Sequence, residues 1–138
     1  MRKLSLLLAA VFLPLLLASA CGGGEEQGIT VEDFTGTWFQ QSAGVYTQFN
    51  EDGTFRAALS VANLEDDPID LGQYRLEGTL VTFVASDESP TCPGLSGSYQ
   101  VELIEEGRLQ FVLEEDPCGK RKSPTSGAPS GPLRRIEP

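Results

Sequence analysis

The 138-residue chain contains no histidine, one tryptophan and one methionine. The absence of histidine excludes a Ser-His-Asp triad, a Cys-His pair and every metal site that uses imidazole. Basic residues are also scarce, because 10 Lys and Arg stand against 20 Asp and Glu, which gives a net charge of −10 at pH 7. An acidic surface repels phosphate backbones, so we expect no nucleic-acid partner.

The N-terminus carries two cations, Arg2 and Lys3, followed by an apolar run from Leu4 to Leu17. Early cations, an apolar core and then small residues are typical of an export signal. The run is shorter than the roughly 20 residues that a membrane-spanning helix needs. We therefore expect residues 1–20 to be a cleaved signal peptide. The remaining chain has 20 acidic and eight basic residues, a net charge of −12.

A cysteine directly follows the expected cleavage site, in the order Ala18-Ser19-Ala20-Cys21. This pattern resembles the lipobox of bacterial lipoproteins. The resemblance implies that Cys21 receives a diacylglycerol and anchors the protein to the membrane, on the extracytoplasmic face of the cell envelope. The alternative is an ordinary signal peptide, with Cys21 a spare thiol. Residues 21–29 include four glycines and are expected to form a flexible tether after the lipidated cysteine.

Beyond residue 30, apolar and polar residues alternate in short segments that are rich in β-branched and aromatic side chains. This period of two predicts strands. Gly53, Gly78 and Gly107 each lie between two such segments, where a tight turn needs positive φ. We predict one all-β domain over residues 30–138, a small antiparallel up-and-down β-barrel of about eight strands. The predicted strands are 36–40, 44–50, 54–61, 72–77, 80–85, 98–105, 108–114 and 133–137.

Residues 34–39, Phe-Thr-Gly-Thr-Trp-Phe, resemble the G-x-W motif in the first strand of the lipocalins and the wider calycin group. The resemblance implies that Gly36 permits a tight entry into the strand and that Trp38 plugs the closed end of the barrel. It also implies that an arginine of the last strand, Arg134 or Arg135, lies across the indole by cation–π contact. Alternatively, Trp38 is simply an aromatic core residue.

Besides Cys21 the chain has two cysteines, Cys92 and Cys118. An even pair in an oxidising compartment predicts a disulfide. A hairpin that turns at residues 106–107 would pair Tyr99 with Glu114, and both cysteines lie just beyond the same end of that hairpin. A structural bridge is favoured over a redox-active pair, because the Cys-x-x-Cys spacing is absent.

No motif points to catalysis, and we expect neither an enzyme nor a cofactor. The acidic residues 65–70 lack the alternating ligands and central glycine of a calcium loop, so they are interpreted as solvated and no metal is expected. Two functions remain. The first is our expectation: a lipid-anchored barrel that binds a small apolar ligand. The alternative is a filled structural module that docks a protein of the envelope. The candidate interior residues are Phe55, Leu59, Phe83, Phe111 and Leu113.

Overall fold

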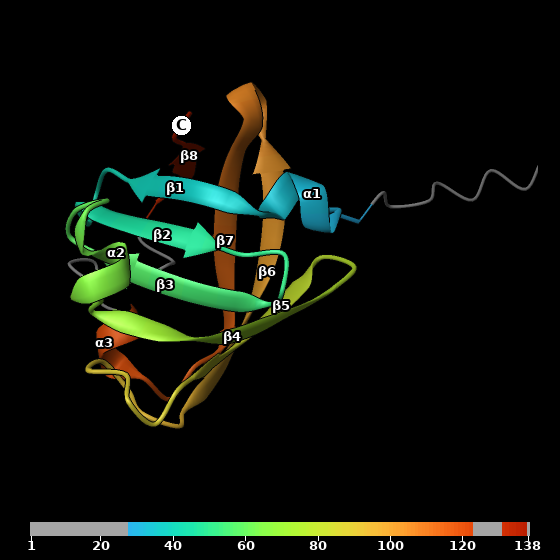
Figure 1. The fold of residues 1–138 in the computed structure, drawn as a ribbon. Helices are drawn as coiled ribbons and strands as arrows, with labels where there is room; N and C mark the ends of the chain where they lie inside the picture. The colour runs from blue at the N-terminus through green and yellow to red at the C-terminus, as the bar shows by residue number, and fades with distance from the viewer. Residues whose placement is uncertain (1–27, 123–130, 138) are drawn as a thin grey trace, which may run out of the picture.

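Eight antiparallel strands form a closed barrel in the computed structural model of the chain (Figure 1). The structure describes residues 28–122 and 131–137, so the expected signal peptide, Cys21 and most of the expected tether lie outside the described residues. Each strand pairs with its successor in the sequence, and the eighth strand returns to the first. The predicted all-β antiparallel barrel is therefore confirmed. Within the described ranges, no helix is long and apolar enough to cross a membrane.

The strands are short and are connected by turns and single helical turns. They are β1 (Gly36–Gln40), β2 (Val45–Phe49), β3 (Thr54–Ala58), β4 (Asp70–Glu77), β5 (Leu80–Ala85), β6 (Ser96–Ile104), β7 (Arg108–Glu115) and β8 (Leu133–Arg135). The helices are α1 (Val31–Phe34), α2 (Asn63–Asp66), α3 (Gly119–Lys122) and the 3-10 turn η1 (Glu105–Gly107).

Most predicted strand ends agree with the observed strand ends to within two residues. The strand predicted over 54–61 ends at Ala58 instead, because the chain turns at Ser60 and the Ser60 carbonyl accepts a hydrogen bond from the Asn63 N–H.

The predicted register of the β6–β7 hairpin is wrong by one residue, since Tyr99 pairs with Leu113 and not with Glu114. The turn η1 holds three residues, and both Glu106 and Gly107 have positive φ, so the hairpin closes between Ile104 and Arg108. A bulge between Ser98 and Tyr99 shifts the register again at the end of the hairpin away from η1.

Alternate residues of the strands point inward and build an aromatic core. Phe55, Phe83 and Phe111 are buried. The Phe83 ring packs with the rings of Phe55 and Phe111, and both Phe83 and Phe111 pack with Phe49 and Tyr99. These three residues were predicted to lie in the barrel interior, and the structure places them there.

Two of the predicted interior residues are exposed instead. Leu59 is 62% exposed, because β3 has ended before it. Leu113 is 41% exposed, because only β6 pairs with that part of β7 among the described strands.

The closed end of the barrel is built around Trp38, which is fully buried. The indole N–H donates to the Phe34 carbonyl at 2.9 Å, which ties β1 to the helix α1. The Arg135 guanidinium lies 4.6 Å from the indole centroid, and its NH2 group donates to the Asp33 carbonyl at 2.6 Å. Gly36 has a φ of 123°, and a Cβ there would come within 3.1 Å of the Arg135 guanidinium. The arginine on the tryptophan is therefore Arg135.

The neighbouring Arg134 points to the outside of the barrel. Its guanidinium lies 5.1 Å from the ring centroid of Phe39, which packs against Tyr46 with 4.6 Å between centroids. The two consecutive arginines of β8 thus cover two aromatic rings on opposite faces of the sheet, as the alternation of side chains along a strand requires.

Substitution at Trp38 tests this account of barrel closure. Trp38→Ala should lower the free energy of unfolding by about 3–5 kcal/mol, as truncation of a buried aromatic does. Arg135→Ala should cost less, and Arg134→Ala, the matched control, should cost least, because only Arg135 covers the indole. Chemical denaturation measures all three. Equal losses for the two arginine variants would contradict the assignment.

Candidate functional site

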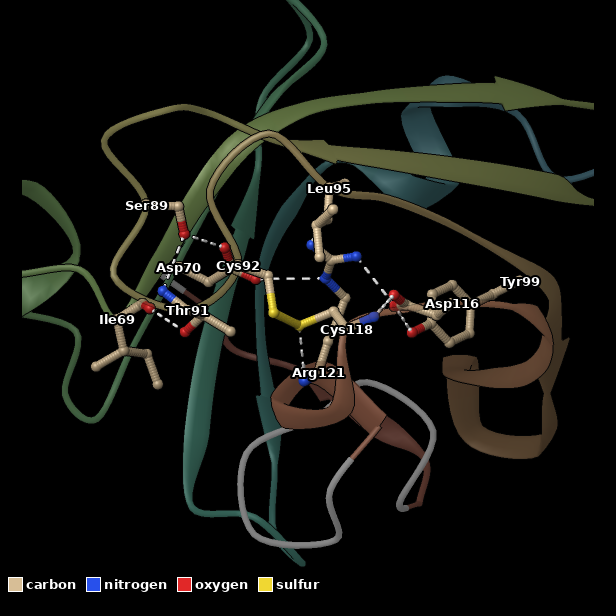
Figure 2. The surroundings of a disulfide bond; sticks show 10 residues. All are labelled: Ile69, Asp70, Ser89, Thr91, Cys92, Leu95, Tyr99, Asp116, Cys118 and Arg121. Atoms are coloured by element: carbon tan, nitrogen blue, oxygen red, sulfur yellow. Dashed lines mark hydrogen bonds and ion pairs between the residues drawn. A yellow bond between two sulfur atoms is a disulfide. The ribbon is translucent and has the colours of Figure 1, made fainter.

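The end of the barrel opposite Trp38 receives the connections that follow β1, β3, β5 and β7, at residues 41–44, 59–69, 86–95 and, in its first described part, 116–122. Three charged residues are buried there. Asp70 is the first residue of β4, Asp116 directly follows β7, and Arg121 is on α3 (Figure 2). Each is at most 7% exposed. We call these residues, with Tyr99 and Ser89, the mouth cluster.

Asp116 is the most heavily bonded member of the mouth cluster. One of its oxygens, Oδ2, accepts from the Tyr99 hydroxyl and from the Arg121 NH1 group, the latter at 3.0 Å. The other, Oδ1, accepts from the Cys118 N–H at 2.7 Å. Gly97 makes room for this carboxylate, since a Cβ at position 97 would lie 2.4 Å from the Asp116 Cγ. Asp116 is therefore fixed by three donors and by the absence of a side chain opposite it.

Asp70 binds the other side of the same guanidinium. Its Oδ1 accepts from the Ser89 hydroxyl at 2.6 Å, and its Oδ2 lies 3.5 Å from the Arg121 Nε. The Arg121 NH2 group points to the Leu95 carbonyl at 3.4 Å. One cation thus stands between two anions. Unpaired charge is costly to bury, so the hydrogen bonds that complete the cluster are needed to stabilise it.

The predicted disulfide between Cys92 and Cys118 is present, and it lies beside the mouth cluster (Figure 2). The two Cα atoms are 5.9 Å apart, and Cys118 is 1% exposed. The Arg121 N–H points to the Cys118 Sγ at 3.2 Å. The bridge links the 86–95 connection to the start of α3, so it holds in place the helix that carries Arg121.

A cavity of about 40 Å³ lies inside the barrel, next to the mouth cluster. Its walls are mainly apolar and include Phe49, Phe55, Phe83 and Phe111, while Gln40, Thr47, Asp70 and Arg121 provide its polar lining. One water needs about 10–15 Å³ in this measure, so the cavity has room for roughly three. Pockets that bind drug-sized ligands are about 300–1,000 Å³. The barrel is therefore almost filled by its own side chains.

The sequence pattern does not indicate the mouth cluster. It predicts that Asp70 belongs to a solvated acidic loop, but Asp70 begins β4 and is 7% exposed. For Arg121, the one signal in the sequence is its position three residues after a cysteine predicted to be bridged, because the bridge draws α3 against the barrel. No group of three or more metal-ligating side chains occurs among the described residues.

Comparisons of the chain with protein-family models, with curated proteins and with solved structures find no match.

The disulfide should contribute directly to stability. In the chain-entropy model, a bridge across the 26-residue separation of Cys92 and Cys118 is worth about 3.5 kcal/mol. The double variant Cys92→Ser/Cys118→Ser should lower the free energy of unfolding by up to that amount, and reduction of the wild-type protein should lower its melting temperature. Peptide mapping under non-reducing conditions should find the two residues joined. Two alkylated thiols in the native protein would refute the bridge.

The titration of Tyr99 should lower the stability of the protein at alkaline pH. Burial, together with the hydrogen bond to the Asp116 carboxylate, raises the pKa of Tyr99 far above its usual value of 10. A raised pKa in the folded state stabilises the protein below pH 10, and that stabilisation is lost as the pH rises further. Above pH 10 the free energy of unfolding should fall by up to about 1.4 kcal/mol per pH unit from this group.

The matched variant is Tyr99→Phe, which keeps the ring and removes the hydroxyl. It should be less stable at pH 7, because Asp116 loses one donor, and its stability should fall less steeply between pH 10 and 11. Tyr74, whose pKa is also raised by burial, is unchanged in both proteins and cancels in the comparison. Parallel profiles for the two proteins would exclude this role of Tyr99.

Proposed function

We propose that this chain is a lipid-anchored, non-catalytic protein of the bacterial cell envelope, in which a filled barrel presents its outer surface to a protein partner. The proposed anchor is a lipid on Cys21, and the proposed location is the extracytoplasmic face of the membrane. The lipobox-like residues 18–21 support the anchor. The bridge between Cys92 and Cys118 supports an oxidising compartment, since disulfides are rare in the reducing cytosol.

The interior volume is the observation that favours a partner on the outside over a ligand on the inside. About 40 Å³ accommodates a few waters, whereas the small apolar ligand expected from lipocalin-like barrels needs several times that space. The polar end of the cavity is lined by Arg121, which is bound to Asp70 and Asp116 and is held by the disulfide-linked helix. With little room for a ligand inside, the outer face of the barrel is the surface that we propose binds the partner protein.

The anchor is tested by Cys21→Ser expressed in the bacterial host. The variant should lose its lipid and move from the membrane fraction to the soluble fraction. Cys92→Ser/Cys118→Ser is the control, because it also loses cysteines but keeps Cys21 and should remain with the membrane. Membrane retention of the Cys21→Ser protein at the wild-type level would refute the lipid anchor.

The choice between partner and ligand is tested by native mass spectrometry of the protein purified from its host. We expect no small-molecule adduct and a complex with one protein at constant stoichiometry. A reproducible adduct of several hundred daltons would overturn the filled-barrel proposal in favour of an apolar ligand, since such a molecule needs far more room than the 40 Å³ of the interior.

A further inference from the structure

The strand that closes the barrel is much shorter than one of its neighbours. β8 has three residues and pairs with β1 at each of them. β7 has eight residues, yet it pairs with β8 only where Leu109 faces Leu133. No strand in residues 28–122 or 131–137 pairs with the same side of β7 from Gln110 to Glu115. We call this segment the β7 edge. Its backbone groups on that side resemble those of an edge strand in an open sheet.

The side chains of the β7 edge are also unusually exposed. In a barrel wall, alternate residues should be buried, but Val112, Leu113, Glu114 and Glu115 are all exposed. Val112 is 49% and Leu113 is 41% exposed, so apolar surface is open on both faces of the strand. Only Phe111 still packs into the core.

We propose that the β7 edge binds an extended, basic segment of a partner protein, which adds a strand beside β7. This inference rests on the proposed function as a protein-docking module and names the surface and the partner chemistry. The backbone groups of the edge that no described strand pairs would hydrogen-bond to an extended chain, as in other cases of strand addition. The exposed side chains of Val112 and Leu113 would contact alternate residues of that chain on the two faces.

Charge selects a basic occupant. Glu114 and Glu115 lie at the end of the edge, and the whole chain has a net charge of −10. An acidic protein attracts a basic segment at long range and repels a second copy of itself. The side-chain amide of Gln110 donates to the Phe111 carbonyl at 3.1 Å, so one acceptor at the start of the edge is already occupied. The strand should therefore form mainly along residues 112–115.

The test uses a synthetic ten-residue peptide in which lysine alternates with valine and threonine. Binding to the folded domain is measured by titration, and its site by amide hydrogen exchange. Saturating peptide should slow exchange at least tenfold at one or more amides in residues 111–115 and leave β2 and β3 unchanged. A peptide with the same lysines but with proline at every second position is the control, because it cannot form a strand, and it should bind at least tenfold more weakly.

Two charge-reversed proteins test the position of the site. Glu114→Lys/Glu115→Lys should weaken binding at least tenfold. Glu105→Lys/Glu106→Lys, which makes the same change of charge at the other end of the hairpin, should weaken it less than threefold. Equal effects of the two variants, equal binding of the proline peptide, or protection elsewhere would overturn the proposal. A partner protein found in the native complex but bound at another surface would reject the β7 edge while leaving the proposed function standing.

Discussion

Closure of the barrel depends on the pairing of β8 with β1, which joins the two ends of the domain through only three residues. Leu133 enters the core, Arg135 covers Trp38, and Arg134 covers Phe39 on the outer face. These contacts bring together segments about a hundred residues apart in the sequence. The cap formed by α1 depends on the same pairing, because Arg135 bonds to the carbonyl of Asp33. The Thr30 side chain begins α1 through a capping box with Asp33, and these hydrogen bonds lower the pKa of the Asp33 carboxyl.

The barrel could be predicted from the sequence because its strands carry strict alternation and its turns carry glycine. The period of two at Val81, Phe83 and Ala85 fixes an inward face whatever the neighbouring strand is. The disulfide could be predicted because an approximate hairpin register suffices to bring two loops together. An error of one residue in that register did not matter to Cys92 and Cys118, whose loops tolerate it. The exposure of Leu113 has a different cause: Leu113 alternates with Leu109 and Phe111 as predicted, but β8 pairs with β7 only at Leu109 and leaves Leu113 exposed.

The mouth cluster could not be predicted, because its existence depends on long-range contacts that have no periodic signal. Asp70 resembles its acidic neighbours in sequence, and only the position of Arg121 inside the mouth distinguishes it. Gly97 likewise precedes the strand predicted over 98–105, yet it belongs to β6 and leaves space for the Asp116 carboxylate. The cluster gives the apolar barrel a polar end without leaving a buried side-chain donor or acceptor unsatisfied in residues 28–122 and 131–137.

The sequence distance between β1 and β8 also shapes how the domain folds. β8 follows β1 by about a hundred residues, so the first strand lacks its second partner until the C-terminal part of the chain reaches it. Loop closure over this distance costs entropy before any native contact compensates for it, which makes it a slow step in folding. During that interval the open side of β1 and the unsealed Trp38 face solvent. Nascent or truncated chains that end before Leu133 are therefore the forms of this protein most exposed to misassociation and to proteolysis.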